Sequence, residues 1–325
     1  MTDPVSAPTH PIAGLVARVH ERHRDVKDGV VATYIPELGR ADPSWYGIAV
    51  ATVDGSVYQA GDTDREFTIQ SVAKPFSYAM ALGRFGGERV QGIVGVEPTG
   101  DAFNAIALDP LTNRPFNPMV NAGAIATSSL LVTGDPVADR DAFVATLSAA
   151  AGRQLSIDEA VFRSEVTTGH RNRAIAYLLL NAGALAAPVD AALDLYFAQC
   201  SVKVNVVDVA RMAATLANIG TNPVSGAEVF PSGAVRDVLS VMFTCGMYDG
   251  AGLWAHRVGV PAKSGVSGII MGVVNRRLGF AVWSPPLNER GNSVRGLRAS
   301  ADLADELGLH VFDPLSIGAS FLDAL

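Results

Sequence analysis

The sequence contains few of the residues that mark several common classes of protein. Its 325 residues include only two cysteines, Cys200 and Cys245, which form neither a metal-binding spacing nor a disulfide framework. We interpret both as buried thiols in a reducing compartment. No stretch approaches the roughly 18 apolar residues of a membrane span, and residues 1–6 lack the basic and apolar pattern of an export signal. The sequence therefore predicts a cytoplasmic protein that does not enter a membrane.

Positive charge is also scarce. Lysine and arginine total 25 against 32 acidic residues, which gives a formal net charge of −7, and the basic residues are scattered. This pattern argues against a surface for nucleic acid or anionic lipid. Gly246, Gly250 and Gly252 lack the following lysine of a phosphate loop, and His170 near Glu165 has no second ligand at metal-binding spacing. We expect no cofactor and no metal.

Only four lysines occur, and two of them lie in motifs with chemical meaning. Ser71 and Lys74 form S-x-x-K, which places an amine within reach of a hydroxyl on one face of a helix, as a general base beside a nucleophile. This motif alone arises by chance in roughly one sequence in four of this composition. Lys263 opens Lys-Ser-Gly, which resembles the K-[ST]-G that accompanies S-x-x-K in penicillin-recognising enzymes. The two motifs in this order are far more specific than either one.

Strand patterns occur near both ends of the chain, and helical patterns lie between them. Asp54-Gly55 predicts a hairpin between strands 46–53 and 56–60, and three later strands are expected at 258–262, 268–275 and 278–284. Helical periodicity covers 12–28, the segment from Ser71, 119–133, 140–151, 171–185, 189–200, 206–219, 232–243 and 293–307. Asn205 and Ser232 are expected to cap the helices that follow them.

These patterns predict an α+β fold in which an antiparallel sheet, flanked by helices, is built from both ends of the chain. Residues 1–83 and 226–325 would form this discontinuous sheet lobe, and residues 84–225 an inserted all-helical lobe. The active site is expected in the cleft between the lobes, with Ser71 at a sheet-to-helix junction.

The chain resembles the serine-dependent glutaminase family, which shares the β-lactamase and transpeptidase fold. The resemblance covers nearly the whole length and depends on a series of short motifs. These are Tyr34-Ile35-Pro36-Glu37-Leu38, Gln70-Ser71-Val72-Ala73-Lys74-Pro75-Phe76, Asn117 to Ile125, Glu165 followed by Asn172-Arg173-Ala174, Tyr196 to Ser201, Cys245 to Gly250 and Lys263 to Gly268.

The resemblance implies a chemistry for the site residues. Ser71 would attack the side-chain amide of L-glutamine with Lys74 as general base, and ammonia would leave as the acyl-enzyme forms. Tyr248 would help in the proton relay, and Tyr34 would close over the substrate. The backbone N–H groups of Ser71 and Val266 would form the oxyanion hole. By the same resemblance, Glu165 would meet the substrate ammonium, while Asn121, Asn172 and Tyr196, together with Ser71, Tyr248 and Val266, would complete the substrate-binding set.

Each assignment has a simpler alternative. Judged singly, Ser71 could be a helix cap, Lys74 a surface residue and Tyr196 a core aromatic, while Glu165 among its neighbouring arginines could form a surface ion pair. Two other functions also remain open, namely a penicillin-recognising hydrolase or peptidase and a non-catalytic amino-acid sensor. The resemblance implies a glutaminase of glutamine catabolism that assembles as a homo-oligomer, either a tetramer or a dimer.

Overall fold

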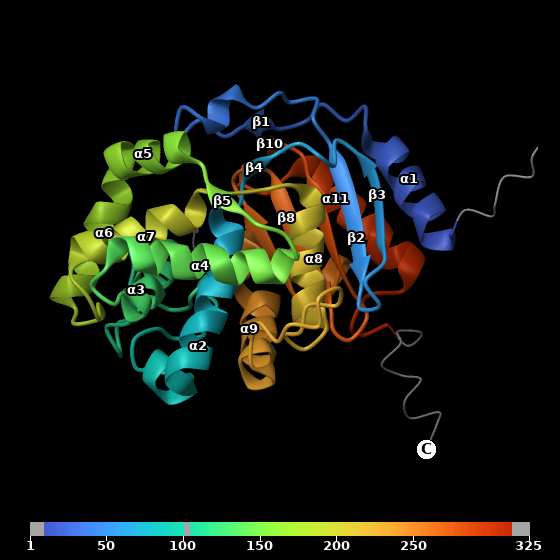
Figure 1. Ribbon diagram of the computed structural model, residues 1–325. Coiled ribbons are helices and arrows are strands. Elements are labelled where there is room, and N and C mark those ends of the chain that lie inside the picture. The colour runs from blue at the N-terminus through green and yellow to red at the C-terminus, as the bar shows by residue number, and fades with distance from the viewer. Residues whose placement is uncertain (1–9, 101–104, 314–325) are drawn as a thin grey trace, which may run out of the picture.

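A computed structural model describes residues 10–100 and 105–313 of the chain. Its main sheet has five antiparallel strands in the order β3-β2-β9-β8-β7 (Figure 1). The strands are β2 Gly47–Thr52, β3 Val57–Gly61, β7 Ala262–Gly265, β8 Ile269–Val274 and β9 Leu278–Trp283. Residues from both ends of the sequence therefore form one sheet, which confirms the predicted α+β architecture.

Two tight turns set the register of this sheet. The turn at Asp54-Gly55 joins β2 to β3, and Gly55 has a φ of 91°, a conformation that glycine adopts without steric cost. Between β8 and β9 the chain turns through residues 275–277, where Arg276 has a φ of 62°. Both turns lie where the sequence predicted them.

Helices cover both faces of the sheet. On one face, α1 Pro11–His23 and α11 Val294–Leu307 pack against alternate strand residues such as Ile48 and Phe280. On the other face, α8 Val206–Ala217 packs against residues such as Ala49 and Ala281 (Figure 1). The predicted cap of α8 is confirmed, because the Asn205 side chain accepts from the Asp208 amide and the Asp208 side chain accepts from the Asn205 amide.

The remaining helices pack beside this sandwich, mostly on the side of α8 away from α1 (Figure 1). They are α2 Lys74–Gln91, α3 Asn121–Leu131, α4 Pro136–Ala151, α5 Glu159–Thr168, α6 His170–Asn181, α7 Val189–Cys200, α9 Ser232–Cys245 and α10 Ala251–Arg257. Two short antiparallel strands, β1 Val30–Val31 and β10 Pro286–Leu287, pair outside the main sheet.

The middle of the chain is not wholly helical, contrary to the expectation. β5 Ser156–Ile157 and β6 Val202–Val204 lie within it, and they form a small antiparallel sheet with β4 Phe67–Thr68 in the order β4-β6-β5. Strands of two or three residues show no alternation of side chains that a sequence pattern could reveal. This small sheet connects the segment before Ser71 to the helical part of the chain.

Three local predictions need correction. Residues 258–260 follow α10, an unpredicted helix, and the strand starts only at Ala262. The α9 helix has Pro231 as its N-cap, so Ser232 is its first residue and not its cap. The first helix ends at His23, well before Gly29.

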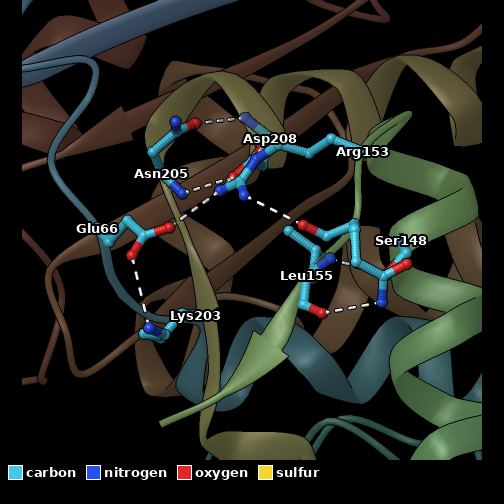
Figure 2. A network of polar contacts seen from close by, with 8 residues as sticks. Glu66, Ser148, Arg153, Leu155, Lys203, Asn205 and Asp208 are labelled. Atoms are coloured by element: carbon cyan, nitrogen blue, oxygen red, sulfur yellow. Dashed lines mark hydrogen bonds and ion pairs between the residues drawn. The ribbon is translucent and has the colours of Figure 1, made fainter.

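An ion-pair network connects the segment before β4 and strand β6 to α8 and to the segment after α4 (Figure 2). Arg153, just after α4, donates from Nε to Asp208 Oδ1 at 2.7 Å and from Nη2 to Asp208 Oδ2 at 2.5 Å. Its Nη2 also lies 3.4 Å from Glu66 Oε1, and Lys203 Nζ lies 3.7 Å from Glu66 Oε2. Because Asp208 is also part of the α8 cap, one buried carboxylate connects the start of α8 to the segment after α4.

Within the described residues, no helix has the length and apolar character needed to cross a bilayer. The expected lack of an export signal concerns residues 1–6, which lie outside the described residues.

Candidate active site

Ser71 lies in a tight turn between a short strand and a long helix. β4 pairs with β6, and the Ile69 amide donates to the Val202 carbonyl at 2.9 Å. The chain then passes through a 3₁₀ turn, Gln70–Ala73, in which Gln70 has a φ of 50°. A left-handed φ is uncommon outside glycine and persists only where the surroundings hold it. Ser71 is buried in this turn, at the predicted sheet-to-helix junction.

Lys74 begins α2 and is 2% exposed, so the simpler interpretation of a surface lysine is wrong. Its Nζ donates to Asn121 Oδ1 at 2.6 Å and to the Met119 carbonyl at 3.2 Å. Burial disfavours the charged ammonium and lowers the pKa of Lys74 to about 8. A substantial fraction of this side chain is therefore neutral near physiological pH and able to accept a proton.

Asn121 links Lys74 to the helical part of the site. It is the first residue of α3, and its Nδ2 donates to Asn172 Oδ1, on α6, at 3.0 Å. Gly123 lets the chain before α3 pack closely on this helix, because a Cβ there would lie 1.9 Å from the Asn117 carbonyl oxygen. The amide of Asn121 thus joins two helices and the lysine into one hydrogen-bonded chain.

Glu165, on α5, is 3% exposed and hydrogen-bonded to a phenol, so it is not a surface ion pair with its neighbouring arginines. Tyr34 Oη lies 3.1 Å from Glu165 Oε1 and 2.6 Å from Gln70 Oε1. Burial raises the pKa of Glu165 to about 7, while hydrogen bonds from Tyr34 and Gln70 oppose that rise. Tyr34 is half-exposed and lies with its hydroxyl turned inward, between the carboxylate and the turn that carries Ser71.

Tyr196, on α7, is buried in an apolar cluster, yet its hydroxyl also hydrogen-bonds the thiol of Cys200 one turn further on. It is therefore a core aromatic with a polar tip. Burial raises the pKa of Cys200 to about 12, and the thiol interacts electrostatically with both Lys74 and Glu165. Tyr196 and Cys200 thus lie beside the other candidate site residues.

Tyr248 lies beside Ser71. Its side chain hydrogen-bonds Ser71, and its Oη donates to the Ser264 carbonyl on β7 at 2.9 Å. The end of β7 lies close to the Ser71 turn, since a Cβ on Gly265 would come within 3.2 Å of the Ile69 carbonyl oxygen. Val266 follows directly and is buried. A cavity of about 340 Å³ borders Tyr248, between Asn117 and α10.

Known proteins resemble this chain over most of its length. A profile of the glutaminase family matches residues 29–312. The chain belongs to the glutaminase family. It is 50% identical to a glutaminase of Nostoc over 308 residues, and this alignment covers 95% of this chain and 92% of the relative. It is 47% identical over 305 residues to a glutaminase of Corynebacterium efficiens, covering 93% of this chain and 72% of that protein.

Solved structures of glutaminases superimpose on the whole fold. That of the probable glutaminase ybaS gives a TM-score of 0.90 at 40% identity and covers 93% of this chain and 98% of its own. The glutamate form of Mglu gives 0.90 at 43% identity over 94% of this chain and 70% of its own. This glutaminase therefore has the β-lactamase-like fold that its sequence predicted.

The predicted site residues of this glutaminase meet through two chains of hydrogen bonds. One runs from Asn172 through Asn121 to Lys74, and the other from Glu165 through Tyr34 and Gln70 to the turn that carries Ser71. Within residues 10–100 and 105–313, no grouping of three or more histidine, cysteine or acidic side chains could hold a metal ion.

Two residues in the site were not singled out from the sequence. Gln70 precedes Ser71, and only its left-handed backbone and its hydrogen bond with Tyr34 reveal its position. Cys200 was interpreted as a buried thiol without a role, although its spacing of four residues from Tyr196 on one helix face is a signal that sequence reasoning could use.

Proposed function

We propose that this protein hydrolyses the side-chain amide of L-glutamine to L-glutamate and ammonia through an acyl-enzyme on Ser71. The observation that carries the assignment is the environment of Lys74, a buried lysine whose pKa is lowered to about 8 next to a buried serine one turn away. Family membership supplies the substrate class, since the relatives named above are glutaminases.

In the first step, neutral Lys74 takes the proton of the Ser71 hydroxyl as its oxygen attacks the amide carbon. The backbone N–H groups of Ser71 and Val266 hold the oxyanion of the tetrahedral intermediate. A proton then passes to the amide nitrogen through Lys74 and Tyr248, and ammonia leaves with the C–N bond broken. Tyr248 suits this relay because its hydroxyl already hydrogen-bonds Ser71.

In the second step, water attacks the acyl carbon, Lys74 accepts its proton, and the Ser71 oxygen leaves with a proton returned to it. Glutamate departs and the free serine is restored. Throughout both steps, ionised Glu165 holds the substrate ammonium, and the amide and hydroxyl groups of Asn121, Asn172 and Tyr196 hold the α-amino acid end. Tyr34, which bonds Glu165, closes over that end.

A coupled ammonia assay with glutamine and asparagine tests this proposal. We expect turnover of glutamine and little of asparagine, whose amide falls about one methylene short of Ser71. Ser71→Ala should abolish turnover yet still bind glutamate. Ser77→Ala is the matched control, because Ser77 Oγ is buried on α2 with no hydrogen-bond partner among the described residues. Full turnover by Ser71→Ala would refute the assignment of Ser71 as the nucleophile.

Of the two alternatives, a penicillin-recognising hydrolase is tested by a chromogenic cephalosporin, which this enzyme should leave intact. An amino-acid sensor would bind glutamine without releasing ammonia. Family membership favours the glutaminase over both.

We further propose a cytoplasmic homo-oligomer, a tetramer or a dimer, that binds neither nucleic acid nor membranes. The two buried free cysteines and the net charge of −7 are consistent with this. Light scattering of the purified protein measures the assembly, and a single monomeric mass would refute it.

A further inference from the structure

Lys263 is a buried lysine that the proposed reaction does not use. It lies on β7 and is 0% exposed. Its Nζ donates to the Gly246 carbonyl at 3.0 Å and to the Ser264 carbonyl at 2.7 Å. Burial of an amine that could carry charge is costly unless its hydrogen bonds are made, so a lysine at this position needs a compensating purpose. Both acceptors flank Tyr248, one before it in the chain and one across from it on β7.

The Lys263 amine also contacts Tyr248 directly. Nζ lies 4.1 Å from the centroid of the Tyr248 ring, within the range of a cation–π contact. The Tyr248 hydroxyl and Lys263 Nζ both donate to the same Ser264 carbonyl oxygen. The ring is therefore packed on the lysine and anchored to the acceptor that the lysine also binds.

The backbone at Tyr248 needs such support. Tyr248 has a φ of 58°, a left-handed conformation that is costly for a bulky residue and persists only where its neighbours fix it. The turn before it is pressed against β7, because a Cβ on Gly246 would lie 1.7 Å from the Ala262 carbonyl oxygen. The Ser264 amide also donates to Gly246 O at 3.2 Å, so Lys263 Nζ is the second donor to that carbonyl.

This arrangement controls which part of the Tyr248 hydroxyl faces the nucleophile. Because its proton is directed at Ser264 O, the phenol oxygen presents its lone pairs to the Ser71 hydroxyl. We propose that Lys263 is a positioning residue. It contacts the Tyr248 ring, shares the Ser264 carbonyl with the Tyr248 hydroxyl and binds the Gly246 carbonyl in the turn before Tyr248, so that the phenol oxygen stays against Ser71. The proposal rests on the hydrolytic function proposed above. Lys74 and Cys245 are the other titratable groups that interact with Lys263, and burial together with Lys74 lowers the pKa of Lys263.

Lys263→Met tests the proposal, since it keeps a long apolar side chain in the same space and removes the amine with both of its hydrogen bonds. We expect kcat for glutamine to fall 10- to 100-fold with KM changed less than threefold, because the groups proposed to hold the amino-acid end are untouched. Lys27→Met, at an exposed position, is the control and should match the wild type.

A double-mutant cycle with Tyr248→Phe separates positioning from general structural damage. If Lys263 acts through the phenol oxygen, Lys263→Met should lower kcat by less than threefold once that oxygen is absent. Losses that multiply in the double variant would overturn the proposal, as would a rise in KM with unchanged kcat. Lys263→Gln, which keeps a hydrogen-bond donor, should recover part of kcat. If the methionine variant does not fold, the same double-mutant cycle is measured with the glutamine variant. Absence of turnover in the wild type would refute the proposed function, whereas wild-type turnover with multiplicative losses refutes only the role of Lys263.

Discussion

The pKa of Lys74 gives the sharpest test of the proposed base. Its lowered pKa of about 8 means that the neutral, active form increases as the pH rises through 8. Below that value the neutral fraction falls about tenfold for each pH unit, so kcat should rise from pH 6 and level off above pH 9. We call this rise of kcat with pH the acid limb of the profile. The substitution Asn121→Asp should move the limb, because Asn121 Oδ1 lies 2.6 Å from Lys74 Nζ and a carboxylate there would raise the pKa of Lys74.

The magnitude follows from the distance. Opposite charges 4 Å apart interact by about 4 kcal/mol at an effective dielectric constant of 20, which corresponds to roughly three pKa units. Burial of the new carboxylate offsets part of this, so we expect the limb to move to alkaline pH by about one to three units. At pH 8, kcat should fall by about 5-fold for a shift of one unit and by about 500-fold for a shift of three.

The assay is direct measurement of glutamate formation from pH 6 to 10 at saturating glutamine. Asn121→Leu is the matched control, because it removes the same hydrogen bond without adding a charge and should lower activity without the alkaline shift. If Asn121→Asp keeps its limb at the pH of the wild type, Lys74 is not the base whose protonation the limb reports.

Three further outcomes are expected. Glu165, whose pKa is raised to about 7, is proposed to bind the substrate ammonium, which requires its ionised form. KM should therefore fall as the pH rises through 7, and Glu165→Gln should remove that dependence at a higher KM. Tyr34→Phe removes a hydrogen bond that stabilises the Glu165 carboxylate, so the same fall in KM should occur at higher pH; an unchanged midpoint would contradict this. Asp208→Ala removes the buried partner of Arg153 and half of a helix cap, and urea denaturation should show a loss of about 3 kcal/mol, the lower end for a buried pair because Arg153 is one-third exposed. Asp28→Ala, at an exposed ion pair, should cost less than about 1 kcal/mol.

Much of the fold could be predicted because it is encoded locally. Asp54-Gly55 and the turn at Arg276 fix hairpins through backbone conformations that few residues adopt, and Asn205 caps α8 through its own side chain. The features that were missed depend on distant residues. The small sheet pairs β4 with β6 and β6 with β5, which joins segments about 135 and about 45 residues apart in strands too short to show a pattern.

The same distinction applies to the site. Ser71 and Lys74 could be identified from their spacing, because three residues on a helix bring two side chains to one face. Their surroundings could not, since Lys74 meets Asn121 across 47 residues and Tyr34 meets Glu165 across 131. Burial of Lys74 and Glu165, which sets both pKa values, results from tertiary packing and leaves no local trace in the sequence.

The two hydrogen-bonded chains of the site end at neighbouring positions. The chain through Asn121 ends at Lys74, and the chain through Tyr34 and Gln70 ends at the residue before Ser71. The groups proposed to bind the amino-acid end are therefore connected to the proposed base on one side and to the turn that carries the proposed nucleophile on the other. A substrate that tightens Glu165 against Tyr34 would also act on Gln70, whose left-handed backbone directly precedes Ser71. Binding and chemistry are thus coupled through the protein, so loss of an anchor such as Tyr34 should lower kcat as well as raise KM.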